Sequence, residues 1–265
     1  MTTLQAIFLA IIEGITEFLP VSSTGHMILA SAVMKIQDTE FAKTFEIVIQ
    51  LGAIMAVVAL YIKRFFVSFD IYLKLFAAFI PTGVIGLLAY KTIKAYLFNP
   101  FVVSIALIVG GVLLILLDKW TENKPRVLGV ETTENVSYKG AVQIGLFQCL
   151  SMIPGVSRAA ATIFGGIFAG FDRKLATEFS FLLAIPTMFA ASAKDLWESK
   201  DMIHGDNIKL LLIGGAVAFV FAIIAIKAFI TFVQKYGFKH FGYYRILLGI
   251  LFLSLSLYLG IELKT

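Results

Sequence analysis

The sequence has little charge and almost no cysteine. Only 15% of its 265 residues are charged, whereas a soluble domain spends about a quarter of its residues on charge. The single cysteine, Cys149, excludes an intramolecular disulfide framework, and the amino terminus lacks the basic region of a secretory signal. What remains is 59% hydrophobic, so we expect an integral membrane protein without a separate soluble domain.

The apolar residues fall into long and short runs. Six runs come close to the roughly 20 residues that a membrane-spanning helix needs. Four shorter pieces form two pairs, broken at Pro20 and at Pro154-Gly155. Non-helical backbone at membrane depth must be covered by protein or line a wet cavity, so each pair predicts a re-entrant helical hairpin. The expected spans are about 44–62, 72–90, 101–118, 175–193, 209–231 and 243–261, and the short pieces are 4–19, 21–34, 140–153 and 157–170.

The expected fold is all-α, a polytopic membrane protein with six transmembrane helices and two re-entrant hairpins. We expect a single membrane domain, 1–265, whose halves 1–118 and 140–265 are joined by the polar loop 119–139. Each half has a broken pair followed by three spans, and laying Pro20 on Pro154 also places Ser23 on Ser157. If the hairpins do not cross the membrane and each half has three spans, the second half is inverted relative to the first. In inverted-repeat membrane proteins the sites lie near the membrane midplane, at interrupted helices.

The basic residues divide unequally between the two sides of this topology. The richer side, which we take as cytoplasmic, receives Lys63, Arg64 and Arg245 among others. Both termini and the entrance of the first broken pair are then predicted to lie outside.

Glu13 and Glu17 lie inside an apolar segment. Four residues apart on a helix, they project from one face, one turn apart. Two neighbouring carboxylates in a poorly solvated site either share a cation or raise the pKa of one of them. The alternative is the solvated face of a helix lying at the membrane surface, but ionisable residues at membrane depth usually belong to a site or pathway.

The first break supplies hydroxyls and an imidazole. Ser22, Ser23 and Thr24 are suited to cap the helix after Pro20, and His26 is close enough in sequence to reach back to Ser22 or Ser23. A hydroxyl beside an imidazole, with acids nearby, can activate an oxygen nucleophile or a water. By spacing alone, His26 could equally be an ordinary packing residue.

The second break has the composition of an anion site. Gly155 follows Pro154 in a turn, a helix then begins, and Ser157, Arg158 and Thr162 add donors at its positive end. Guanidinium matches phosphate oxygens bidentately. The alternative, a structural arginine paired with Glu13 or Glu17, does not exclude phosphate binding.

The two breaks together resemble a known family. Glu-x-x-x-Glu followed by Phe-Leu-Pro-Val-Ser-Ser-Thr-Gly-His, and later Pro-Gly-x-Ser-Arg with a downstream threonine, are similar to the undecaprenyl-diphosphate phosphatases, bacterial membrane enzymes also named for bacitracin resistance. The similarity covers essentially the whole chain. One departure is Ala159, where the family usually has a second serine after the arginine, so this chain offers no hydroxyl at that place.

The resemblance implies hydrolysis of undecaprenyl diphosphate to the monophosphate carrier used for peptidoglycan and other wall polymers. It implies a plasma-membrane enzyme whose site opens to the outer face, with a divalent cation, Mg²⁺ or Ca²⁺, for which Glu13 and Glu17 are the candidate ligands. The partners are the lipid substrate and membrane lipid, with no nucleic acid, and a homodimer is allowed. The expected catalytic residues are Glu13, Glu17, Ser23, His26 and Arg158, and the expected phosphate-binding residues are Ser22, Thr24, Gly155, Ser157, Arg158 and Thr162.

Two alternatives follow from the residues. Ser23 is the leading nucleophile, with His26 as its proton partner, but a water could attack while Ser23 only orients the phosphate. Inverted repeats with interrupted helices are also a transporter plan, so a polyprenyl-phosphate flippase is the second functional hypothesis. A protein that only binds and moves the lipid does not require a glutamate pair beside Ser23 and His26. The presence of this pair therefore favours the enzyme over the flippase.

Overall fold

The structure, a computed structural model, describes residues 1–36, 39–66, 68–97, 99–122, 132–133, 136–198 and 205–259. Within these residues the regular secondary structure consists of helices joined by turns. Within these ranges six helices are long and apolar enough to cross a membrane, as predicted. They are α3 (Glu40–Tyr61, continued by the 3-10 helix η1, Ile62–Phe66), α4 (Asp70–Leu97), α5 (Pro100–Glu122), α8 (Arg173–Glu198), α9 (Asp206–Tyr236) and α10 (Lys239–Leu259).

The four shorter helices also lie where the sequence predicts them. They are α1 (Thr3–Thr16), α2 (Ser23–Val33), α6 (Tyr138–Gln148, continued by η3, Cys149–Met152) and α7 (Arg158–Phe168). α1 packs against α2, and α6 packs against α7, so each broken pair is a hairpin. The polar connection between the two halves, predicted at 119–139, lies largely outside the described residues.

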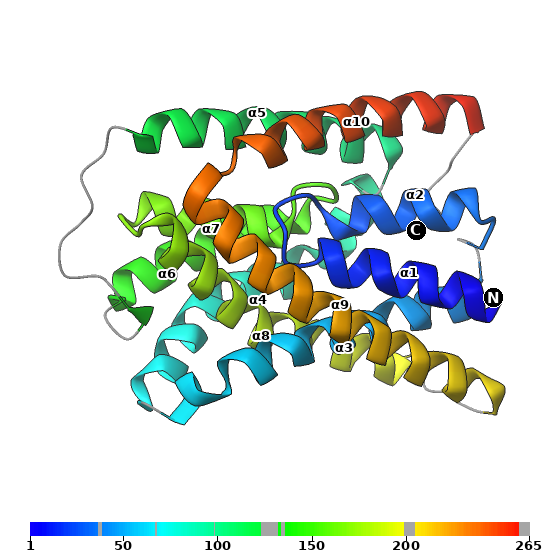
Figure 1. The fold of residues 1–265 in the computed structure, drawn as a ribbon, viewed down its shortest axis with the longest axis horizontal. Helices are drawn as coiled ribbons and strands as arrows, with labels where there is room; N and C mark the ends of the chain where they lie inside the picture. The colour runs from blue at the N-terminus through cyan, green and yellow to red at the C-terminus, as the bar shows by residue number, and fades with distance from the viewer. Residues whose placement is uncertain are drawn as a thin grey trace.

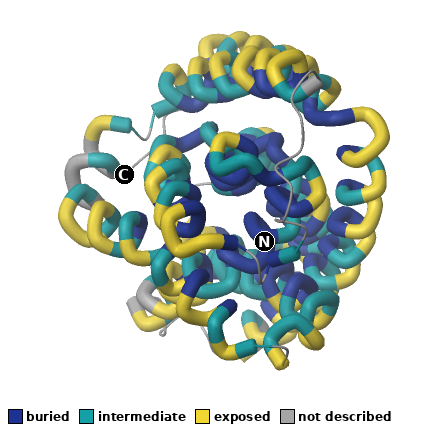
Figure 2. The backbone as a smooth tube through the Cα atoms, turned by 90° about the vertical axis from the view of Figure 1, so that its left-hand side faces the viewer, coloured by how far each residue is buried: buried dark blue, intermediate teal, exposed yellow. Residues whose placement is uncertain are grey.

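The outer surface of the helices is apolar. Leu87, Leu88 and Tyr258 are each more than 80% exposed, on α4 and α10, and many other large apolar side chains are exposed as well. In Figure 2 the exposed segments lie mainly around the outside and the buried ones toward the middle. A surface of this kind suits hydrocarbon rather than water, which agrees with a multi-pass membrane protein.

The hairpin tips meet in the interior. In Figure 1, α5 and α10 run along one edge, while the turn between α1 and α2 and the turn before α7 point toward each other near the centre. The hydroxyl of Ser157 donates to the carbonyl oxygen of Leu19 at 3.5 Å, which links the two tips directly. α1 begins and α10 ends at the same end of the molecule (Figure 1).

The first hairpin bends earlier than its proline suggests. α1 ends at Thr16, with Glu17 as its C-cap, and Pro20 lies inside the turn that follows. The backbone N–H of Glu17 still donates to the carbonyl of Glu13 at 2.9 Å, so the two glutamates keep helical spacing. The turn therefore presents Glu17 at the tip of the hairpin and leaves Glu13 one turn inside it.

Candidate active site

Both helical breaks are built around a serine with an unusual backbone. Ser22 (φ 69°) is the N-cap of α2 and Ser157 (φ 75°) is the N-cap of α7, and each side chain accepts a hydrogen bond from the N–H three residues on. A residue other than glycine rarely adopts a positive φ, and such conformations are concentrated at functional sites. As the N-cap with a positive φ, Ser157 of the second break corresponds to Ser22 of the first break. The sequence comparison had paired Ser157 with Ser23, which is the next residue.

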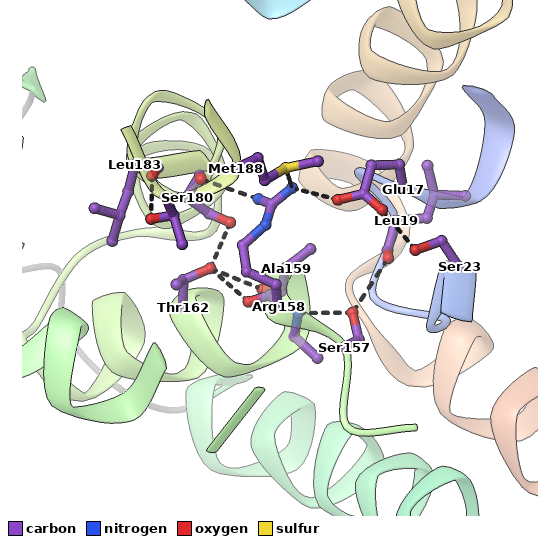
Figure 3. Close-up of polar contacts among 12 residues, drawn as sticks. Glu17, Leu19, Ser23, Ser157, Arg158, Ala159, Thr162, Ser180, Leu183 and Met188 are labelled. Atoms are coloured by element: carbon purple, nitrogen blue, oxygen red, sulfur yellow. Dashed lines mark hydrogen bonds and ion pairs between the residues drawn. The ribbon is translucent and has the colours of Figure 1, made fainter. Parts of the chain in front are cut away.

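A line of polar contacts joins the two hairpins (Figure 3). The hydroxyl of Ser23 donates to Glu17 Oε2 at 2.5 Å, and Arg158 Nη2 donates to Glu17 Oε1 at 3.0 Å. The side chains of Glu17 and Arg158 are only 5% and 10% exposed, so this ion pair is almost completely removed from solvent. The sequence alternative of an arginine paired with a glutamate is confirmed, with Glu17 as the partner.

Arg158 has further contacts and one free donor. Its Nη1 donates to the carbonyl of Ser180 at 3.2 Å, and its guanidinium lies over the ring of Phe18, 5.3 Å from the centroid. Its Nε is buried and has no hydrogen-bond partner in the described structure. A buried arginine N–H without an acceptor is costly and rare, so this donor is suited to a ligand oxygen.

The contacts lie in the wall of a cavity of about 740 Å³. Most of the predicted site residues line it: Glu17, Ser22, Ser23, Thr24, Gly155, Ser157 and Arg158. Apolar residues of four other elements line it too, among them Ile47 of α3, Gly86 of α4, Met152 of η3 and Ala191 of α8. Glu40, Lys43 and Asp195 line it as well, so the cavity combines donors for an anion with both apolar and charged residues.

His26 does not pair with the Ser23 hydroxyl, so the predicted proton partnership is wrong in this structure. Its Nδ1 lies 2.8 Å from the Ser22 carbonyl oxygen, and its Nε2 lies 2.6 Å from the Tyr244 hydroxyl. Because a carbonyl only accepts, Nδ1 carries a proton and Nε2 is left to accept from the tyrosine when the ring is neutral. The imidazole also stacks on the Tyr244 ring, at 5.6 Å and 8°, and does not line the cavity.

Thr162 and Glu13 are close to the site but do not face the cavity. Thr162 is fully buried, and its hydroxyl contacts the carbonyls of Arg158 and Ala159 and the Ser180 hydroxyl, the last at 2.6 Å. It fixes the start of α7 against α8, so its predicted direct role in phosphate binding is not supported by this geometry. Glu13 is 4% exposed and lies behind Glu17.

Sequence reasoning missed several contributors from later helices. Thr187 lines the cavity and receives a hydrogen bond of 3.1 Å from the buried Gln148, which also donates to Thr82 of α4 at 2.9 Å. Gln148 thus connects α6 to α4 and α8 beside the cavity wall. Tyr244 and Arg245 of α10 were missed because no local motif surrounds them.

Comparison with known proteins agrees with this geometry. The family described as "Bacitracin resistance protein BacA" matches residues 6–251. The chain belongs to the BacA family. Its relatives include a protein named undecaprenyl-diphosphatase from Flavobacterium johnsoniae, which is 51% identical over 262 residues that cover 98% of each chain. A protein of the same name from Wolinella succinogenes is 51% identical over 253 residues, which cover 96% of this chain and 98% of the relative.

A third BacA relative spans the full chain. The protein named undecaprenyl-diphosphatase from Bdellovibrio bacteriovorus is 51% identical over 264 residues, covering 100% of this chain and 99% of its own. The names of these relatives describe a hydrolase and therefore favour the enzyme over the flippase alternative.

Proposed function

We propose that this BacA-family protein hydrolyses undecaprenyl diphosphate to undecaprenyl phosphate and inorganic phosphate, and so returns the lipid carrier to cell-wall synthesis. The observation that supports it most is the line from Ser23 through Glu17 to Arg158, which joins a hydroxyl, a carboxylate and a guanidinium from both breaks at one cavity. Family membership and the names of the relatives support the same substrate.

Arg158 and the start of α7 bind the terminal phosphate. The entering phosphate replaces Glu17 on the guanidinium and also accepts from the free Nε. The positive end of α7 begins at this arginine, directly after Ser157. These donors stabilise charge on the phosphoryl oxygens in the transition state, which is the main task of a protein in phosphoryl transfer.

Ser23 and Glu17 carry out the proton transfer. Glu17 takes the Ser23 proton, the Ser23 oxygen attacks the terminal phosphorus, and the bond from phosphorus to the bridging oxygen breaks. Undecaprenyl phosphate leaves with that oxygen. Water then cleaves the phosphoserine ester, inorganic phosphate leaves, and the proton returns to Ser23. In the rival pathway a water attacks directly, Glu17 takes its proton, and Ser23 only orients the phosphate.

The candidate ligands for a divalent cation are Glu17, which lines the cavity, and Glu13, which lies one helical turn behind it. Among the described residues, no group of three His, Cys, Asp or Glu side chains is placed to hold a metal. Mg²⁺ needs no such group when one or two carboxylates and the substrate phosphates bind it. Glu13 and Glu17 would hold Mg²⁺ or Ca²⁺, and a bound ion would neutralise charge on the diphosphate.

The substrate's two parts match the two kinds of cavity wall. The diphosphate meets the polar breaks, while the apolar lining near Ile47, Gly86 and Met152 suits the start of the prenyl chain, whose remainder stays in lipid. We place the protein in the bacterial plasma membrane with this cavity open to the outer face and both termini outside, as the basic residues predict.

Phosphate release tests the proposed function. The purified protein in detergent is given undecaprenyl diphosphate with Mg²⁺, and inorganic phosphate and lipid product are both measured. We expect equal amounts of the two. Tight lipid binding without release of phosphate would instead support the flippase alternative.

A further inference from the structure

Arg245 of α10 connects both helical breaks to the helices behind them. It is fully buried, and its guanidinium donates to five backbone carbonyl oxygens. These acceptors are Pro20 (3.0 Å) of the first break, Gly155 (2.9 Å) and Val156 (2.9 Å) of the second, and Ala106 (3.0 Å) and Leu107 (3.3 Å) of α5. Since arginine has five N–H donors, this side chain is fully used.

The chemistry at this position requires arginine. A buried cation is expensive and is retained only when its hydrogen bonds are satisfied. The planar fork of a guanidinium can reach carbonyls of three segments at once, whereas a lysine ammonium has three donors and no fixed plane. The arrangement therefore depends on more than positive charge.

The surrounding glycines leave room for this guanidinium. A methyl group at Gly110 of α5 would overlap Nη2 of Arg245. Gly155 has a positive φ of 92°, and a methyl group there would lie 2.6 Å from the carbonyl oxygen of Val103, also on α5. α5 and α10 thus form the support against which the tip of the second break is held.

The contacts of Arg245 do not depend on the ion pair between Glu17 and Arg158. That pair crosses the cavity wall and must open if phosphate is to take its place on Arg158. Two other direct contacts join the tips. The hydrogen bond from Ser157 to the Leu19 carbonyl is 3.5 Å long and weak, and the Arg158 guanidinium over the Phe18 ring belongs to the same side chain that must rebind phosphate. Arg245 binds the main chain of both tips, so it holds them together while the ion pair is exchanged.

We propose that Arg245 is a positioning residue for the hydrolysis, and this inference rests on the proposed function. It fixes the distance between the half that carries Glu17 and Ser23 and the half that carries Ser157 and Arg158. A displacement of about 1 Å between reacting groups can cost roughly 10²-fold in rate. Loss of the guanidinium therefore lowers kcat far more than it weakens substrate binding.

Arg245→Lys tests this role against a purely structural one. We expect kcat for phosphate release to fall about 10²-fold while KM changes less than about threefold, because Arg158 and the apolar wall remain. Gly110→Ala retains Arg245 but adds a methyl group that pushes its guanidinium aside, so we expect this variant to lower kcat as well. Both rates are normalised to folded protein, measured as the monodisperse fraction with its melting temperature.

Two matched controls lie away from the site. Arg173→Lys weakens a different arginine contact, 2.9 Å to Asp118, and Gly215→Ala adds a methyl whose nearest neighbour is 3.9 Å away. Both are expected to retain wild-type kcat per folded molecule.

The inference is overturned if Arg245→Lys keeps kcat within threefold of wild type, if its loss is no larger than that of Arg173→Lys, or if Arg245→Lys and Gly110→Ala both fail to fold. An inactive wild type would instead count against the proposed function.

Discussion

At the scale of single residues, Glu17 is the central side chain because its two oxygens have different partners. One accepts from Ser23 and the other accepts from Arg158, on opposite hairpins. A carboxylate in this position can keep the arginine neutralised before substrate enters and can take the serine proton afterwards. The site is thus complete only when both breaks are present.

Replacement of Arg158 tests the anion-binding half. We expect Arg158→Ala to lower kcat for phosphate release by about 10²- to 10³-fold, the usual cost of removing a donor that stabilises transition-state charge. Arg158→Lys should recover only part of this loss, because an ammonium lacks the bidentate geometry. The control is Lys227→Ala on the exposed side of α9, and near-normal rates for Arg158→Ala would remove this residue from the site.

The sequence predicted these residues better than it predicted their partners. Glu17, Ser23 and Arg158 are recognisable because polar residues are rare in an apolar chain. Arg245 was counted among the cytoplasmic basic residues, since it lies near the end of an apolar run, yet it is fully buried beneath the hairpin tips. Its acceptors are backbone carbonyls, which any residue supplies, so no sequence pattern can reveal such a contact.

At the scale of helices, the two breaks share one construction. Each has a proline in the turn and a serine N-cap with positive φ, followed by a short helix. The prolines made the breaks predictable, but the first helix ends at Thr16, before its proline, and the predicted match of Ser23 to Ser157 is one residue out. The exact end depends on tertiary contacts of the tip, which helix propensity does not contain.

The positive φ of Ser157 leads to a prediction about the free energy of unfolding of its variants. Glycine adopts a positive φ without strain and costs only a few tenths of a kcal/mol as an N-cap, whereas alanine loses the cap and keeps the strain. We therefore expect Ser157→Gly to be more stable than Ser157→Ala by about 1 kcal/mol. Thermal unfolding in detergent measures the difference.

The matched control uses a serine within a regular helix. At the exposed Ser254 of α10, glycine should be less stable than alanine by about 1 kcal/mol, which reverses the order. An alanine variant more stable than the glycine variant at position 157 would contradict the role we assign to its backbone.

At the scale of the whole molecule, the order of helices repeats. α1 to α5 and α6 to α10 both consist of two short helices followed by three long ones. The number and approximate ranges of the long helices were predictable from hydropathy, because each crosses hydrocarbon. We propose that the halves are an inverted repeat, which brings the two breaks together from opposite sides of the membrane.

Cysteine labelling tests the orientation. In a Cys149→Ala background, a cysteine in place of Thr3, exposed at the start of α1, should react with an impermeant maleimide in intact cells. A cysteine in place of Lys235, exposed at the end of α9, should react only after the membrane is opened. The reverse pattern would place the termini inside and contradict the orientation drawn from the basic residues.

The central claim is that Ser23 and Glu17 act as one nucleophile and base on a phosphate held by Arg158. The most direct measurement is the rate of phosphate release from undecaprenyl diphosphate by Ser23→Ala, Glu17→Gln and the double variant, each normalised to folded protein. Residues that act as a unit are strongly non-additive, so we predict that the double variant is about as slow as the slower single variant. A Ser23→Ala rate near that of wild type, or a double variant slowed by the product of the two single losses, would contradict the account.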